Sequence, residues 1–149
     1  MRRIKDSGQS LFEVVVALAI STIIIIALVS LVSSSIRNTT FSKNKTLAAR
    51  YAQEATEWLR SQRDDDIDTF MTNTQSTTWC LQDLSFDDVG ICSSTETIDG
   101  TPFLRQVAFS PCTSCSTTVV QADITVSWND SQGNHEVTSS TNFSDWRER

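Results

Sequence analysis

The chain has 149 residues, a formal net charge of −6, and only four glycines and two prolines. This length allows one folded domain in addition to a membrane segment. No basic patch with interleaved aromatic residues occurs, so the composition disfavours a nucleic-acid-binding protein. Serine and threonine are abundant, which is typical of a β-rich exported surface rather than of a disordered linker.

The chain begins with a short basic segment that is followed by a long apolar run. Three basic residues precede Gly8, and no charged residue occurs from position 14 to position 36. A helix rising ~1.5 Å per residue needs ~20 apolar residues to cross ~30 Å of hydrocarbon, so we predict the first, transmembrane half of a long helix at 9–36. The run is longer than the ~7–15 apolar residues of a signal peptide, which predicts that the helix stays attached.

Glu13 is the one charged residue from position 9 to position 36. A charged side chain at a helix centre costs roughly 2.5–3.5 kcal/mol on insertion scales, and an intramembrane carboxylate is therefore a functional candidate. The simpler alternative is an ordinary signal anchor whose Glu13 lies among the lipid headgroups.

The order of these features carries a family resemblance. A basic leader ends in Gly8, Glu13 is the fifth residue after it, and the apolar helix follows at once. This arrangement resembles the N-terminus of type IV prepilins and type II secretion pseudopilins, and the segment VVVALAIS is most similar to the minor branch. The family usually has Phe or another apolar residue and then Thr after the glycine. Gln9 and Ser10 depart from that pattern, so the resemblance supports leader cleavage more strongly than methylation of Gln9.

The resemblance implies a subunit of a pilus or pseudopilus. A prepilin peptidase would cut between Gly8 and Gln9 on the cytoplasmic side, and Glu13 would pair with the new amine at Gln9 during assembly. The implied partners are other pilin or pseudopilin subunits, the peptidase, pilus assembly platform proteins and the cytoplasmic membrane, crossed once. No cofactor and no direct nucleic-acid partner are implied. Basic residues flank both ends of the run, so only the resemblance places the leader inside and residues 37–149 outside.

An amphipathic helix is predicted to continue the membrane helix over 37–63. No proline or glycine interrupts positions 9 to 63, and ion pairs between Arg50 and Glu54 and between Glu57 and Arg60 are expected on its outer side. Apolar residues recur there at three- and four-residue spacing: Leu47, Ala48, Tyr51, Ala52, Ala55, Trp58 and Leu59.

Residues 64–102 are predicted to form a polar loop region with scattered apolar anchors. It opens with Asp64, Asp65 and Asp66, which oppose the dipole of a helix C-terminus and are therefore expected to begin the loop. Clustered carboxylates can hold a hard cation such as calcium. Because the EF-hand spacing and its glycine are missing, the three aspartates are more simply a solvated charge run, and no metal site is predicted.

Residues 103–149 are predicted to form a small antiparallel sheet. Apolar and polar residues alternate from Phe103 to Ser110 and from Val119 to Trp128, and a turn cluster at 129–134 leads to a return strand from Glu136 to Phe143. A hairpin is unstable alone, so the helix at 37–63 must cover its apolar face. The expected fold is α+β, with one long helix on a small sheet. This architecture and the closing hairpin also resemble minor pilins.

All four cysteines follow the apolar run, and three disulfide connectivities are possible. Sequence proximity favours Cys80 with Cys92 and Cys112 with Cys115. A redox function for the second pair would need a helix N-terminus, and a zinc site would need a second CxxC pair, so structural disulfides are the simpler interpretation.

No residue pattern predicts an enzyme. His135 is the one histidine and lies beside a turn, and no catalytic triad, phosphate loop or glycine-rich cofactor fingerprint occurs. The preferred hypothesis is therefore a minor pilin or pseudopilin subunit. The alternative is a membrane-tethered binding or adhesion domain that never polymerises. A pilin-like subunit loses residues 1–8 and shears off with filaments, whereas a tethered domain keeps its leader and stays with the membrane.

Overall fold

A computed structural model describes residues 11–75, 78–111 and 119–145 of the chain. The chain divides into two compact units, one ending at Ser42 and one beginning at Lys43. Helix α1, Leu11–Asp65, contributes its first part to one unit and its last part to the other. The two units are described in turn.

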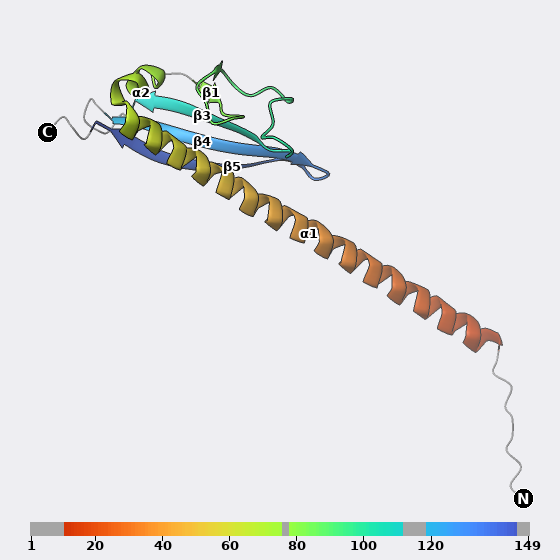
Figure 1. The fold of residues 1–149 in the computed structure, drawn as a ribbon. Coiled ribbons are helices and arrows are strands. Elements are labelled where there is room, and N and C mark those ends of the chain that lie inside the picture. The colour runs from red at the N-terminus through yellow and green to blue at the C-terminus, as the bar shows by residue number, and fades with distance from the viewer. Residues whose placement is uncertain (1–10, 76–77, 112–118, 146–149) are drawn as a thin grey trace, which may run out of the picture. The chain divides into compact units, whose positions relative to one another are not determined.

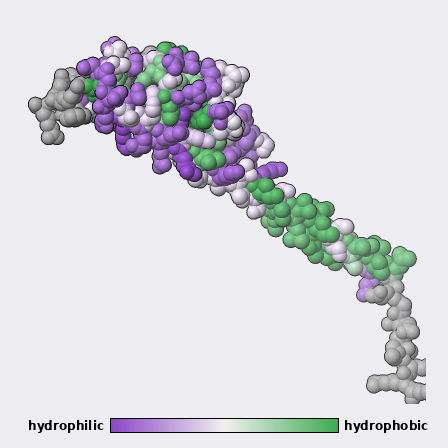
Figure 2. Space-filling view, in the orientation of Figure 1, coloured by the Kyte–Doolittle hydropathy of each residue, from purple (hydrophilic) through white to green (hydrophobic). Residues whose placement is uncertain are grey.

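The first unit consists, among the described residues, of the beginning of α1. Every residue from Leu11 to Thr40 is exposed, and hydrophobic residues cover most of the face of this helix that Figure 2 shows. The helix persists because it contains no proline or glycine and because all backbone bonds close within it, as lipid requires. Its hydroxyls also bond to the helix backbone: Ser21 donates to the carbonyl of Ala17 and Thr22 to that of Ala19, both at 2.8 Å.

The second unit joins the end of α1 to a short helix and a five-stranded antiparallel sheet. The chain order after α1 is α2 (Ile67–Asn73), β1 (Thr78–Cys80), β2 (Asp88–Val89), β3 (Leu104–Pro111), β4 (Val119–Asp130) and β5 (Gly133–Ser144). In space the strands lie in the order β2-β1-β3-β4-β5, and Figure 1 shows β3, β4 and β5 side by side. The long N-terminal helix and the antiparallel sheet confirm the predicted α+β class.

The predicted hairpin forms, with longer strands than expected. Pairing of β4 with β5 runs from Val119 opposite Ser144 to Asp130 opposite Gly133, so the turn contains two residues rather than the expected 129–134. The Asp130 carboxylate accepts a bond from the backbone N–H of Gln132 at 2.7 Å, which holds the tight turn. Gly133 has a φ of +120°, a conformation that side chains with a Cβ rarely adopt.

The core lies between α1 and one face of the sheet. The predicted inward residues of β4 are buried: Ala122, Ile124 and Val126 have no exposed surface, and Trp128 keeps 2%. On α1 the buried residues are Ala48, Ala52, Ala55, Thr56 and Leu59. Aromatic rings add to this core, with Tyr51 and Phe103 at 5.4 Å and Trp58 and Phe86 at 4.8 Å between ring centroids.

The prediction of a loop over 64–102 was wrong in part, because α2, β1 and β2 lie within it. Asp64 and Asp65 belong to the last turn of α1, and the chain leaves the helix only at Asp66. The Asp66 carboxylate then caps α2 by accepting from the backbone N–H groups of Asp68 and Thr69 at 3.1 and 3.2 Å. A single capping residue thus separates two helices, which the run of three aspartates concealed.

Candidate functional site

The residues with a predicted function lie at the start of α1. Glu13 occupies the first turn of the helix and is exposed. Anionic side chains near a helix N-terminus interact favourably with the helix dipole, so this position suits a carboxylate. Gly8 and Gln9 lie outside the described residues, as does the predicted cleavage site between them.

The apolar part of α1 is the one candidate membrane span among the described residues. It is long and apolar enough to cross a bilayer by length and composition, and none of its most apolar stretch is buried. Leu11 is 82% exposed, and Ile23 and Leu31 are each 67% exposed. An apolar surface of this extent is unusual on a soluble monomer and must be covered by lipid or by other apolar side chains.

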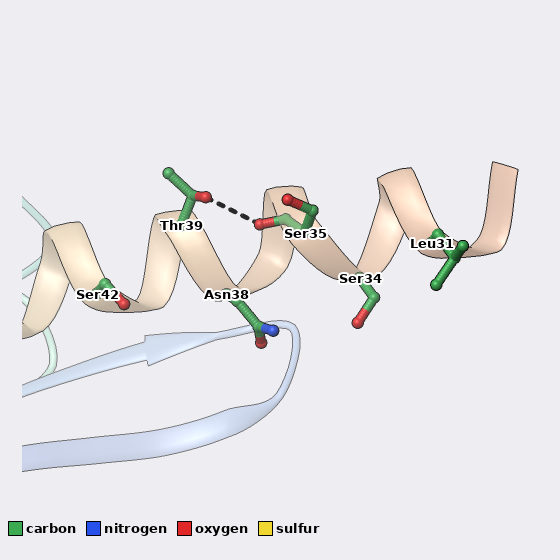
Figure 3. A pocket seen from close by; sticks show the side chains of 6 residues that line it. All are labelled: Leu31, Ser34, Ser35, Asn38, Thr39 and Ser42. Atoms are coloured by element: carbon green, nitrogen blue, oxygen red, sulfur yellow. Dashed lines mark hydrogen bonds between the residues drawn. The ribbon is translucent and has the colours of Figure 1, made fainter. Parts of the chain in front are cut away.

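Small polar residues predominate from Ser33 to Ser42, interrupted by Ile36, Arg37 and Phe41. Figure 3 shows a shallow groove on α1 lined by Leu31, Ser34, Ser35, Asn38, Thr39 and Ser42. Thr39 donates its hydroxyl to the carbonyl of Ser35 at 2.9 Å, so this hydroxyl is already satisfied within the helix. No titratable group lines the groove, and we assign no chemistry to it.

The disulfide predicted between Cys80 and Cys92 is confirmed. Its sulfurs are 2.04 Å apart, and it closes a loop with a sequence separation of 12 between β1 and the segment after β2. Glu96 lies close enough to both sulfurs to suggest a metal site, but sulfurs joined in a disulfide do not supply thiolate ligands. The predicted bridge between Cys112 and Cys115 lies outside the described residues.

The three aspartates at the end of α1 have structural roles in part. Arg63 donates to the Asp64 carboxylate at 2.7 Å, and Asp66 caps α2. Two of the three carboxylates, those of Asp64 and Asp66, therefore bind groups of the protein itself rather than being only solvated, as the sequence analysis expected.

A buried arginine, missed by the sequence analysis, connects α1 with the disulfide loop. Arg105 on β3 is 2% exposed and donates to the Glu54 carboxylate at 2.8 Å. It also donates to the carbonyl of Leu81 at 2.9 Å, and weaker bonds of 3.4 Å reach the carbonyls of Tyr51 and Gln82. Burial lowers the pKa of Arg105, and its contact with Glu54 opposes that effect.

The expected ion pair between Arg50 and Glu54 was wrong, because Glu54 pairs with Arg105 instead. The buried guanidinium is the better partner, since it has lost its water and offers donors in a fixed geometry. The expected pair between Glu57 and Arg60 is confirmed, with a distance of 2.6 Å. Both of those side chains are largely exposed, so this pair contributes little to stability.

His135 lies across the hairpin from Trp128, with ring centroids 5.3 Å apart, and its Nε2 is 3.0 Å from the Asp130 carboxylate. The pKa of Asp130 is lowered, first by the backbone N–H of Gln132 and then by His135. These contacts stabilise the end of the hairpin. We treat the group as structural.

Comparison with protein-family models, with curated proteins and with solved structures finds no match to this chain. The functional interpretation therefore depends on the chain's own residues, in particular on the N-terminal segment and on the exposed apolar helix.

Proposed function

We propose that this protein is a minor type IV pilin or type II secretion pseudopilin subunit, cleaved after Gly8 and assembled into a pilus or pseudopilus. The observation that carries the proposal is the segment from Gly8 to Glu13, which leads directly into an exposed apolar helix. The α+β domain that follows is of the kind expected for such a subunit, with the last part of one long helix packed on an antiparallel sheet.

The exposed helix supports a subunit that exchanges one apolar environment for another. In the membrane, lipid covers side chains such as Leu11 and Ile23, and in a filament the helices of neighbouring subunits cover them. Each fully covered aliphatic side chain is worth roughly 1.5–3 kcal/mol relative to water. Transfer between lipid and a helical bundle therefore costs little, and packing details can decide the direction.

Glu13 supplies the specificity that apolar packing lacks. In a dry helical bundle an isolated carboxylate is strongly unfavourable, whereas a carboxylate paired with an amine is tolerated. After cleavage, the new amine at Gln9 would be such a partner, on a neighbouring subunit or on the same one. A pair of this kind fixes the axial register of one helix against the next.

The second unit is built to persist outside the cell. Its Cys80–Cys92 disulfide is stable in oxidising compartments, and its polar outer strand suits an aqueous surface. Residues on β5 that point away from α1 are all exposed: Asn134, Glu136, Thr138, Ser140, Asn142 and Ser144.

The test is the N-terminal residue of the protein purified from its host, measured by mass spectrometry. The proposal predicts a chain that begins at Gln9, and a Gly8→Ala or bulkier variant that keeps its leader. Ser7→Ala is the matched control, because it changes the leader by one atom and leaves Gly8 intact. A wild-type protein that begins at Met1 or Arg2 would instead favour a tethered domain that does not polymerise.

A further inference from the structure

Charge is unevenly distributed along the chain. Residues 14–50 contain four basic residues and no acidic residue, whereas residues 51–149 contain sixteen acidic and five basic residues. The four cations are Arg37, Lys43, Lys45 and Arg50, and all are exposed on α1. None of them forms an ion pair with any described residue.

Three of these cations follow the apolar run closely in sequence. Arg37 is the first residue after the uncharged stretch, and Lys43 and Lys45 come within nine residues of its end at Ile36. Nine residues span at most about 14 Å as a helix. The Lys and Arg side chains can also extend back toward a membrane surface while their apolar stems stay in contact with it.

We propose that Arg37, Lys43 and Lys45, here called the juxtamembrane cations, bind the headgroups of acidic phospholipids in the membrane that α1 crosses. The inference rests on the part of the proposed function that places α1 across a bilayer. The lipid source follows from continuity, because the same helix that enters the hydrocarbon brings these cations to its surface. Each Lys or Arg near an anionic surface gains about 1 kcal/mol, which corresponds to roughly a fivefold change in binding.

The acidic residues of the chain follow these cations in sequence. An anionic membrane attracts the juxtamembrane cations and repels the sixteen carboxylates beyond position 50. Acidic lipids would thus bind the unassembled subunit through the juxtamembrane cations, and extraction of the subunit into a filament would have to break those contacts.

The test uses the full chain in nanodiscs of phosphatidylcholine with 30 mol% phosphatidylglycerol, released and analysed by native mass spectrometry. The measured quantity is the ratio of phosphatidylglycerol to phosphatidylcholine retained on the protein. We expect the wild type to exceed the ratio of the bilayer. Lys43→Gln/Lys45→Gln should lower that excess by roughly fivefold for each cation. High salt should lower it too, and sodium phosphate should act no more strongly than sodium chloride at equal ionic strength.

The matched control is Arg50→Gln/Arg60→Gln, which removes two exposed cations further from the apolar run and should change the ratio less than twofold. A wild type without excess phosphatidylglycerol, or a control that loses as much as the lysine variant, would overturn the inference. A second measurement is chemical crosslinking of the chain to itself in pure phosphatidylcholine. If Lys43→Gln/Lys45→Gln reduces that crosslinking, the partner of these lysines is a second copy of the chain, and the inference is overturned. A chain that does not float with phosphatidylcholine vesicles would contradict the membrane span itself, whereas an inserted chain without lipid preference overturns only the inference.

Discussion

In the unit that ends at Ser42, helix α1 buries none of its side chains from Leu11 to Thr40, whereas in the unit that begins at Lys43 it buries Ala48, Ala52 and Leu59 almost completely. The same helix is thus covered by its own domain in one unit and lacks any cover of its own in the other. The first unit depends on an external apolar environment, and the second brings its own core. Substitutions that are equivalent in chemistry should therefore differ in effect according to the unit.

The largest expected effect is the loss of Arg105. Arg105→Met should destabilise the second unit by about 3–5 kcal/mol, because it leaves the carbonyl groups of Leu81, Tyr51 and Gln82 without this donor, at about 1–3 kcal/mol for each buried one. Glu54 also loses its partner, but its half-exposed carboxylate can be hydrated instead. The free energy of unfolding is measured by urea titration of the full chain in micelles, with tryptophan fluorescence as the signal. Membrane insertion should be unchanged, and equal stability of the variant and the wild type would contradict the structural role of Arg105.

A matched pair of leucines on α1 tests the comparison directly. Leu59 is 0% exposed and Leu31 is 67% exposed. Leu59→Ala should cost about 2–5 kcal/mol in the same unfolding assay, whereas Leu31→Ala should fall within about 0.5 kcal/mol of the wild type. Similar losses for both variants would show that the two units unfold as one and that the division at Ser42 has no energetic meaning.

Removal of the disulfide should cost somewhat less. Cys80 and Cys92 close a short loop, so Cys80→Ser/Cys92→Ser is expected to lower the free energy of unfolding by roughly 3 kcal/mol. Dithiothreitol should reproduce the effect in the wild type and have little further effect on the double variant. A double variant as stable as the oxidised wild type would mean that the contacts of Arg105 alone hold this loop.

The smallest expected effect concerns the end of the hairpin. Folding lowers the pKa of Asp130 below its ordinary value of 3.8, chiefly through the backbone N–H of Gln132. The charged carboxylate therefore stabilises the folded state at pH values above 3.8. This contribution to stability is lost as the pH falls from 3.8 through the lower pKa that Asp130 has in the folded protein. The difference in unfolding free energy between the wild type and Asp130→Asn should therefore shrink as the pH falls over that acid range. A difference that grows on acidification would contradict this assignment.

The sequence predicted those parts of the fold that are set by local periodicity. The alternation from Ala122 to Trp128 identified the buried face of β4, and the spacing of Ala48, Ala52 and Leu59 identified the buried face of α1. Sequence proximity was sufficient for the Cys80–Cys92 pair. In each case the residues that decide the structure lie within a short stretch of chain.

What the sequence did not predict depends on contacts between distant residues. Arg105 occupies an inward position of β3, between the buried Phe103 and Val107, where a charged residue breaks the apolar pattern. Its partner Glu54 lies 51 residues earlier, so the nearer Arg50 was chosen as the partner. Strand β1 was missed because it has three residues and exists through its pairing with β3.

The central claim is that α1 leaves the membrane for a filament core in which Glu13 pairs with the amine at Gln9. The most direct measurement is the fraction of subunit in sheared filaments relative to membranes for the wild type, Glu13→Leu and Glu13→Gln, with leader cleavage checked in the same samples. Both variants should insert and be cleaved normally, since an apolar or neutral residue is cheaper to hold in lipid. Both should be depleted from filaments, Glu13→Gln included, because it keeps the shape of the side chain but leaves the amine without a counter-charge. Normal incorporation of both variants would contradict the pairing, and an absence of the wild-type subunit from filaments would contradict the proposed function.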